Sequence, residues 1–153
     1  MITEKKFVDL DNARVEQQKK VMEQIVTDKS CPFCKENLHK YHKEPLLKNG
    51  TFWILTKNQW PYENTSVHIL AIYKKHAENL ADIDPAAGEE LFALFQWAEK
   101  EYTVPGGAFA MRFGDTEYSA GTVNHIHAQF IQPNLTSASY EPVRFKIGKN
   151  HSK

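Results

Sequence analysis

The chain has 153 residues, and its 19 basic and 19 acidic side chains balance at neutral pH. This length suits a single domain with a substantial core. The balanced charge gives no sign of nucleic acid or an anionic membrane as the partner. No run approaches the roughly 20 apolar residues of a membrane span. The residues after Met1 lack the apolar core of a signal peptide, so we expect a cytoplasmic protein.

The first predicted element is a polar amphipathic helix over residues 11–28. Its apolar stripe is narrow and consists of Val15, Met22, Ile25 and Val26. We therefore expect an N-terminal helical extension at residues 1–30, followed by the main domain at residues 31–153. The extension is interpreted either as a surface helix packed on that domain or as a helix that binds a partner.

The next feature is the knuckle Cys31-Pro-Phe-Cys34, which contains the only two cysteines of the chain. In a reducing cytosol such a pair is more typical of metal binding or thiol redox chemistry than of a structural disulfide. Zinc requires two further ligands for a closed tetrahedral site. Spacing alone slightly favours a local solution with His39 and His42. The long-range candidates are His68, His76 and His125.

The remaining pattern predicts strands and one main helix. A strand at residues 51–56 follows the Asn49-Gly50 turn, and a loop over 58–66 leads to a second strand. A helix begins at Asp84-Pro85 and ends before Pro105. The other predicted strands are 67–73, 108–113 and 125–132, with a final edge strand at 143–147. This order predicts an α+β domain, in which one helix packs on an antiparallel sheet of about five strands.

The most informative stretch runs from His125 to Ile131. On an extended strand His125, His127 and Gln129 share one face, and the residues between them form an apolar opposite face. A neutral imidazole can attack phosphorus or carry a proton near neutral pH. The glycine- and hydroxyl-rich run over 114–124 offers backbone N–H groups for phosphate oxygens. These residues therefore predict a reactive face next to a phosphate loop.

His125-x-His127-x-Gln129 followed by two hydrophobic residues resembles the motif of the histidine triad (HIT) family, with Gln in place of the third His. The stretch from Val67 to His76 resembles the strand and loop that precede that motif in the family. The cysteine knuckle stands where many members bind zinc, and Asn58 stands in a loop similar to the family's ribose-side loop. The Gln variant is similar to galactose-1-phosphate uridylyltransferase and to the dinucleoside polyphosphate phosphorylases.

This resemblance implies a HIT-like fold, a homodimer, and an enzyme that binds nucleotides. It would cleave a phosphoanhydride, phosphoester or phosphoramidate through a nucleotidyl-histidine intermediate. An amide cannot shuttle a proton near neutral pH, so Gln129 favours nucleotidyl transfer or phosphorolysis over hydrolysis. The alternatives are a nucleotide hydrolase of the same type and a nucleotide-binding or scaffold protein with little turnover.

The resemblance also implies a role for individual positions. His127 would be the nucleophile, Gln129 would hold a phosphate oxygen, and Asn58 would bind the ribose. The implied catalytic residues are His125, His127 and Gln129, and the implied nucleotide- and phosphate-binding residues are Asn58, Gly121, Thr122, Val123 and Asn124. The implied ligands of a structural zinc are Cys31, Cys34, His76 and His125, which we prefer to the local set with His39 and His42.

Overall fold

The computed structural model describes residues 5–151, and an antiparallel five-stranded sheet with the order β1-β2-β3-β5-β4 forms its centre. The strands are β1 (Leu46–Asn49), β2 (Trp53–Lys57), β3 (Thr65–Tyr73), β4 (Ala108–Arg112) and β5 (His127–Pro133). The helices are η1 (Leu10–Asn12), α1 (Glu16–Asp28), α2 (Leu38–Tyr41), η2 (Leu80–Asp82), α3 (Ala86–Glu101) and α4 (Thr116–Ser119). The predicted α+β class with its antiparallel sheet is confirmed.

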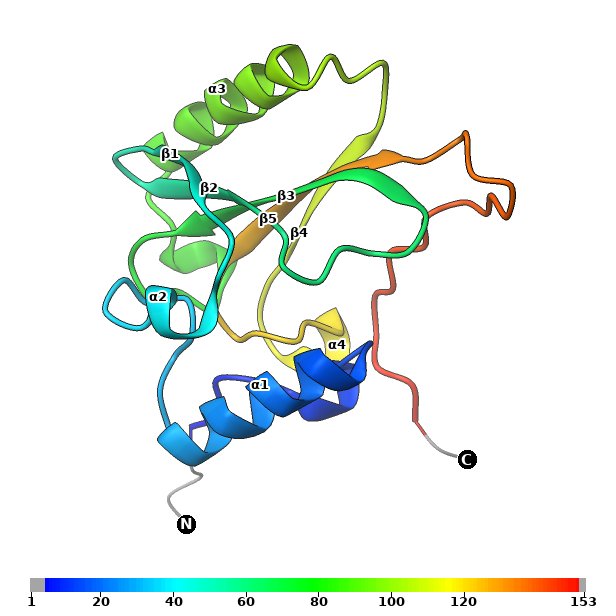
Figure 1. Cartoon of the computed structure of the whole chain (residues 1–153). Coiled ribbons are helices and arrows are strands. Elements are labelled where there is room, and N and C mark those ends of the chain that lie inside the picture. Colours follow the sequence, from blue (N-terminus) through cyan, green and yellow to red (C-terminus); the bar gives the residue numbers. More distant parts are fainter. Residues whose placement is uncertain (1–4, 152–153) are drawn as a thin grey trace.

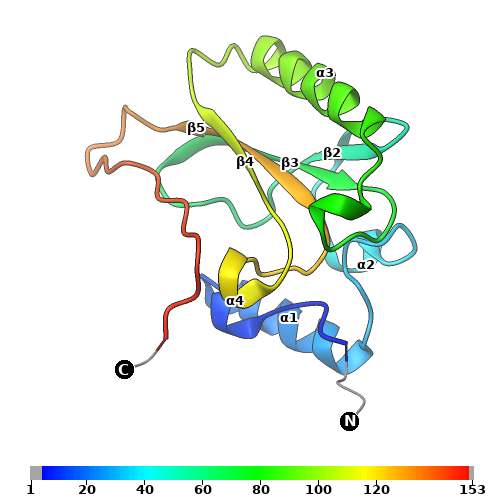
Figure 2. The same cartoon turned by 180° about the vertical axis from the view of Figure 1, so that it is seen from behind.

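Helix α3 lies along one face of the sheet, and α1, α2 and α4 lie beyond the other face (Figures 1 and 2). The main core fills the space under α3, where Leu91 and Phe95 meet Ile69 and Ala128. The Trp53 indole N–H also donates to the Ala87 carbonyl at 2.8 Å, which joins β2 to the start of α3. One sheet face is thus sealed, so the site can form only on the opposite face.

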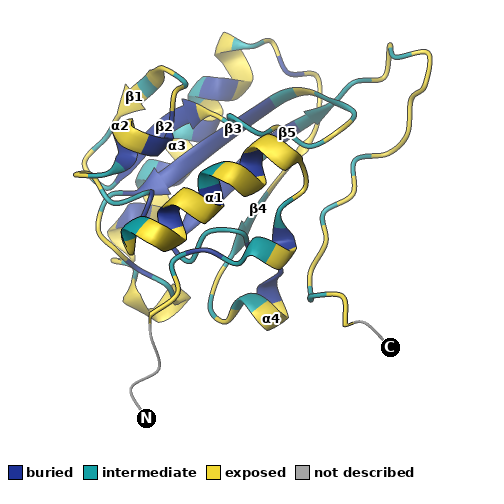
Figure 3. Cartoon of the chain, turned by 60° about the horizontal axis from the view of Figure 1, so that its bottom comes forward, coloured by how far each residue is buried: buried dark blue, intermediate teal, exposed yellow. Residues whose placement is uncertain are grey.

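Two smaller clusters lie on the other side of the sheet, and one of them includes residues of the sheet itself. Leu38 of α2 packs with Ile54, Leu70 and Ile72 of the sheet, and Phe33 lies against them. In the second cluster, Met22 and Ile25 of α1 pack with Val8 and Tyr41. Figure 3 shows the resulting division of α1 into a buried side and an exposed side. The N-terminal segment is therefore a surface helix packed on the domain.

The prediction of an edge strand at residues 143–147 is wrong. This C-terminal segment is extended but pairs with no strand, and the fifth strand is instead β1, which forms a hairpin with β2. The Lys146 carbonyl accepts hydrogen bonds from the Arg112 side chain rather than from a neighbouring backbone. Phe145 packs on that same guanidinium, whereas Ile147 is 76% exposed. The alternating pattern therefore reflects contacts with one arginine and not a buried sheet face.

No helix within residues 5–151 combines the length and the apolar character needed to cross a membrane.

Candidate active site and metal centre

Strand β5 separates a polar face from an apolar face. His127 and Gln129 line a pocket on the side of α1 and α2, whereas Ala128 and Phe130 belong to the core under α3. His125 lies just before the strand and is 2% exposed. The alternation therefore places His127 and Gln129 in one pocket, whereas His125 is buried and does not line it.

The hydrogen bonds of His127 fix its tautomer. Its Nδ1 lies 2.7 Å from the backbone carbonyl of His125, which can only accept, so Nδ1 carries the proton. The lone pair is then on Nε2, for which the described residues provide no hydrogen-bond partner. The Phe33 ring stands edge-on to the imidazole, with 5.1 Å between ring centroids. His127 is thus held in the tautomer and orientation that a nucleophile needs.

A chain of three groups orients the Gln129 amide. The backbone N–H of Tyr62 donates to Nδ1 of His68 at 3.0 Å, so the His68 proton is on Nε2. That N–H lies 2.8 Å from Oε1 of Gln129 and donates to it. The Gln129 carboxamide oxygen is therefore turned toward β3, which leaves its NH₂ group as a donor toward the pocket.

Burial keeps these imidazoles neutral. Desolvation lowers the pKa of His127 to about 4 and the pKa of His68 to about 4, in both cases against weaker opposing hydrogen bonds. At pH 7, His127 is therefore neutral in nearly every protein molecule, and its Nε2 has a free lone pair. Protonation of either ring is disfavoured because the cation would lose its hydration.

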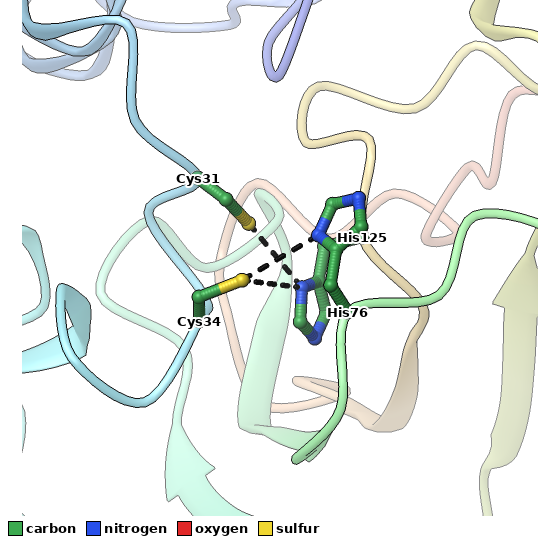
Figure 4. A group of neighbouring side chains, drawn as sticks. All are labelled: Cys31, Cys34, His76 and His125. Atoms are coloured by element: carbon green, nitrogen blue, oxygen red, sulfur yellow. Dashed lines mark hydrogen bonds between the residues drawn. The ribbon is translucent and has the colours of Figure 1, made fainter.

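Four potential metal ligands converge in one group (Figure 4): Cys31, Cys34, His76 and His125. Their donor atoms all lie within 4.8 Å of one another. The Sγ of Cys31 is 3.3 Å from Nδ1 of His125, and the Sγ of Cys34 is 3.5 Å from Nδ1 of His76. Tetrahedral zinc with usual Zn–S and Zn–N bonds requires about 3.5 Å between sulfur and nitrogen. The spacing therefore fits zinc.

The outer hydrogen bonds of both histidines agree with metal ligation through Nδ1. His125 donates from Nε2 to the Tyr73 carbonyl at 2.5 Å, and His76 donates from Nε2 to Oε1 of Glu78 at 2.8 Å. Ligating histidines usually donate their second N–H in this manner. Burial, together with the neighbouring Cys31 thiol, raises the pKa of Cys34 to about 12, so a metal would displace a thiol proton on binding.

The local alternative for the metal is not assembled. His42 is buried and its Nε2 lies 2.8 Å from the Thr56 hydroxyl on β2, and His39 is exposed on α2. Neither belongs to the group of four potential ligands. Spacing favoured the local pair because sequence separation contains no information on tertiary contacts. In the folded chain, His76 and His125 are far from the cysteines in sequence but lie next to them.

The loop over 121–124 contacts the N-terminal segment. The N–H of Asn124 donates to the Phe7 carbonyl at 2.7 Å, and the N–H of Gly121 donates to the Ser119 hydroxyl at 3.2 Å. Within the described residues, the N–H groups of Thr122 and Val123 have no hydrogen-bond partner, and both residues line the pocket. The loop therefore offers two backbone N–H groups to a phosphate, those of Thr122 and Val123, and one side-chain donor, the Thr122 hydroxyl.

Asn58 lines the same pocket at the end of β2. Its Oδ1 accepts the Trp60 N–H at 2.8 Å, which fixes the direction of the carboxamide. Its Nδ2 lies 3.1 Å from Nε2 of His68, which itself carries a proton. That nitrogen donates to Gln129 and cannot accept from Asn58, so the Asn58 NH₂ group is available as a donor to an incoming oxygen.

Sequence reasoning missed several residues of the pocket. Arg112 lies opposite His127 in the pairing of β4 with β5, and Tyr62 accepts one of its N–H groups at 2.7 Å. Arg14 and Asn12 come from the N-terminal segment, and the Oδ1 of Asn12 has no partner within the described residues. The pairing of β4 with β5 offered a signal for Arg112. Nothing in the sequence indicated that the N-terminal segment reaches the site.

No family model matches the sequence, and no curated protein sequence matches it at a significant level. Solved structures do match. A zinc-bound histidine triad family protein from Mycobacterium smegmatis aligns with a TM-score of 0.55 and 22% identity over 76% of this chain and 83% of its own. A hypothetical histidine triad nucleotide-binding protein from Sulfolobus tokodaii aligns with a TM-score of 0.55 and 19% identity over 80% and 82% of the two chains.

A third structure, a histidine triad protein from Clostridium difficile, has a TM-score of 0.51 and 18% identity over 67% of this chain and 90% of its own. All three relatives are named for the histidine triad. The chain therefore has the histidine triad fold, as its sequence motif predicts.

Proposed function

We propose that this chain is a nucleotide-cleaving enzyme of the histidine triad type, in which His127 forms a covalent nucleotidyl intermediate. The observation that carries the proposal is the state of His127. Its Nδ1 proton is bound to the His125 carbonyl, and its Nε2 lone pair faces a pocket that also contains the Gln129 amide. A neutral, fixed imidazole of this kind can act as a nucleophile toward phosphorus.

In the first step, Nε2 of His127 attacks the α-phosphorus of the nucleotide. The P–N bond forms, and the bond to the leaving group breaks with its electron pair. The imidazole becomes a cation that keeps its Nδ1 proton, and the His125 carbonyl stabilises that charge by accepting the hydrogen bond. In the second step an oxygen of the acceptor attacks phosphorus, and Nε2 recovers its lone pair.

Donors around the phosphorus would stabilise charge on the phosphate oxygens. The Gln129 NH₂ group is oriented by His68, and the hydroxyl and N–H of Thr122 and the N–H of Val123 supply further donors. Each positioned donor of this type contributes roughly 2.7–4 kcal/mol to the transition state. Gly121 and Asn124 would shape this loop through their N–H groups, which donate to the Ser119 hydroxyl and the Phe7 carbonyl.

The sugar would lie between Asn58 and the N-terminal segment. The free Asn58 donor suits a ribose hydroxyl oxygen, and the unpartnered Oδ1 of Asn12 suits a hydroxyl or amine donor of the ligand. Asn12 is only 6% exposed, and its Nδ2 donates to the Gly121 carbonyl, which fixes the direction of Oδ1. A buried acceptor without a partner costs stability until a ligand satisfies it.

Zinc would be held by Cys31, Cys34, His76 and His125. When bound, it supplies a structural crosslink and no chemistry at phosphorus. These ligands connect the knuckle with the loop after β3 and with the residue just before β5. By binding His125, the metal would also fix the position of the His125 backbone carbonyl, which accepts the Nδ1 hydrogen bond of His127.

We favour transfer to an oxygen nucleophile such as inorganic phosphate over transfer to water. A third histidine would be able to take a proton from water, whereas the Gln129 amide cannot. Inorganic phosphate is already anionic at neutral pH and needs no general base. The reaction would then release a nucleoside diphosphate.

Product analysis tests the function and the acceptor together. The protein is incubated with diadenosine tetraphosphate, adenosine phosphoramidate and nucleotide sugars, each with and without inorganic phosphate, and products are separated by chromatography. Nucleoside diphosphate that requires phosphate establishes phosphorolysis. Nucleoside monophosphate in both conditions makes water the acceptor. Binding without any product leaves a nucleotide-binding protein and contradicts the proposal.

We also propose a homodimer that forms along β4. This strand is at the edge of the sheet, and Phe109 on it is 49% exposed. Phe92 of α3 is 58% exposed and stacks edge-on with Phe109, with 5.7 Å between ring centroids. An open strand edge beside exposed aromatic rings is a favourable surface for pairing with a second copy.

A further inference from the structure

The pocket that contains His127 carries more positive charge than one phosphate requires. Four cationic side chains line it, from three parts of the chain: Arg14, Arg112, Arg144 and Lys146. Asp11 is the one carboxylate in the lining, and its Oδ2 is paired with Lys149 at 2.9 Å. The excess charge is therefore not cancelled inside the pocket.

Arg14 and Arg112 stand on the same aromatic ring. The Cζ of Arg14 lies 4.3 Å from the centroid of the Tyr62 ring, and the Cζ of Arg112 lies 6.0 Å from it. Within residues 5–151 neither guanidinium forms an ion pair with a carboxylate. Two like charges on one ring repel each other, so an anion between them would lower the energy of both.

Backbone and ring contacts hold both guanidinium groups in place. Arg14 donates to the carbonyls of Trp60 and Pro61 at 2.5 and 3.3 Å. Arg112 donates to the Tyr62 hydroxyl and twice to the Lys146 carbonyl, and its Cζ lies 3.8 Å from the Phe145 ring. These contacts leave one N–H on each terminal nitrogen of both arginines, and Nε of Arg14 in addition. Both guanidinium groups are therefore fixed in position and retain unused N–H donors.

The position of Arg112 connects this pair to the reacting atoms. Arg112 and His127 are directly opposite each other in the pairing of β4 with β5, so their side chains share one face of the sheet. Thr122 and Gln129 face the same pocket. An anion on the two arginines is therefore a neighbour of the phosphate that His127 attacks.

We propose that Arg14 and Arg112 form a second anion-binding subsite, and that the substrate is a nucleotide whose leaving group carries at least one phosphate of its own. The inference about the substrate rests on the proposed function. When the P–N bond to His127 forms, the bridging P–O bond breaks and its electron pair goes to the leaving phosphate. The guanidinium N–H groups stabilise that anion, so it departs without a proton.

This subsite complements Gln129. The Gln129 amide cannot protonate a leaving group, which an amine needs and an anionic phosphate does not. Planar guanidinium groups match phosphate geometry through paired N–H donors.

The first experiment measures binding of inorganic tripolyphosphate to the full chain by calorimetry at fixed ionic strength. Arg14→Gln is the decisive variant, since Arg112 also holds the C-terminal segment. We expect Arg14→Gln and Arg112→Gln each to weaken binding about 10- to 100-fold, because each removes charged hydrogen bonds to the anion. Lys19→Gln removes one charge from an exposed position of α1 outside the pocket, and should leave binding within about twofold.

The second experiment compares kcat/KM for diadenosine tetraphosphate and adenosine phosphoramidate, which share a nucleoside and differ in the leaving group. Arg14→Gln should lower the value for the tetraphosphate about 10- to 100-fold and that for the phosphoramidate less than about threefold. Arg14→Lys keeps the charge but loses the planar group. Its kcat/KM for the tetraphosphate should lie between those of Arg14→Gln and the unchanged protein.

Equal losses on both substrates, or no loss on the tetraphosphate, would overturn the subsite and leave the proposed function standing. If the unchanged protein cleaves neither nucleotide and binds tripolyphosphate only through the two arginines, the proposed function fails and the anion site remains. If tripolyphosphate binding is the same in Arg14→Gln, Lys19→Gln and the unchanged protein, the two arginines do not form an anion site.

Discussion

At the scale of single residues, the main result is that backbone groups determine the protonation of the site. The Tyr62 N–H and the His125 carbonyl cannot exchange donor and acceptor roles. They therefore fix the tautomers of His68 and His127 without reference to any side-chain assignment. The orientation of Gln129 follows from His68, so one buried histidine controls the donor that faces the phosphate.

Replacing His68 tests this control. In His68→Ala the Gln129 amide is free to turn, and we expect kcat to fall about 10-fold while the dissociation constant of the nucleotide changes less than about threefold. A double-mutant cycle with Gln129→Ala provides the control. If His68 acts through Gln129, its loss has no further effect on kcat in the Gln129→Ala protein. Additive losses would show that His68 acts by another route.

Acid should destabilise the protein through its buried histidines. Burial lowers the pKa of His68 to about 4, and it also lowers the pKa of His42. An unfolded chain titrates these rings near 6.5 and so binds more protons than the folded one below that pH. The free energy of unfolding should therefore fall as the pH drops below about 6.5, by up to about 1.4 kcal/mol per pH unit for each ring.

Urea denaturation from pH 8 to pH 5 measures this slope. His68→Gln removes one of the titrating rings and should give a shallower slope than the unchanged protein. The difference between the two proteins cancels titration at the metal centre, which both retain. A slope that is unaffected by the substitution, or a stability that rises on acidification, contradicts the neutral state assigned to His68.

Among the elements, the sequence predicted β2, β3, β4, β5 and the main helix because each has a strong local pattern, whereas it did not predict β1 (Leu46–Asn49). The structure contains β5 and α3 where their alternation and capping pattern predict them, with small shifts at their ends. The segment over 143–147 has the same alternation but lies extended along Arg112 instead. Alternation predicts an extended chain with two unlike sides, and it does not specify that the partner is another strand.

The proposed metal ligands illustrate a different limit. Spacing identified the Cys31 and Cys34 pair, but it favoured His39 and His42, which the structure does not bring to the cysteines. His76 and His125 reach the knuckle only because β3 and β5 are adjacent antiparallel strands. The resemblance to a known family supplied that long-range information, which no local rule contains.

Removing zinc tests the proposed metal centre. We expect about one zinc per chain by elemental analysis, and a melting temperature that drops about 10 °C in excess chelator. A ligand present at a thousand times its Kd stabilises a folded protein by about 4.1 kcal/mol. For a chain of this length, that free energy corresponds to a change of about 10 °C in the melting temperature. Cys31→Ser should lose the metal, and His39→Ala should retain it. Full zinc content in Cys31→Ser contradicts the assigned ligands.

At the scale of the whole molecule, the N-terminal segment is the part that sequence reasoning placed least well. Its amphipathic helix was predicted, but its contribution of Asn12 and Arg14 to the pocket was not. Helical periodicity predicts which side of α1 is buried. It does not predict which part of the domain the residues before α1 contact. The unpartnered Oδ1 of Asn12 is a property of the assembled molecule alone.

The proposed dimer is testable at this same scale. A charge at Phe109 should prevent two β4 edges from meeting, because a carboxylate in the interface would be buried without a partner. Sedimentation velocity should therefore give a dimer for the unchanged protein and a monomer for Phe109→Glu. Leu135→Glu places the same charge at a residue that is 67% exposed after β5, and should remain a dimer. A monomeric unchanged protein, or a dimeric Phe109→Glu, contradicts the interface.

A nucleotide bound covalently to His127 can be trapped and identified. The protein is mixed with diadenosine tetraphosphate in the absence of inorganic phosphate, quenched in alkali to preserve a P–N bond, digested and analysed by mass spectrometry. We expect an adenylyl group on the peptide that contains His127, and we expect this group to be lost when phosphate is added before the quench. We also expect that His127→Ala binds nucleotide but forms neither adduct nor product. Product formation by His127→Ala, or an adduct on another residue, would contradict these expectations.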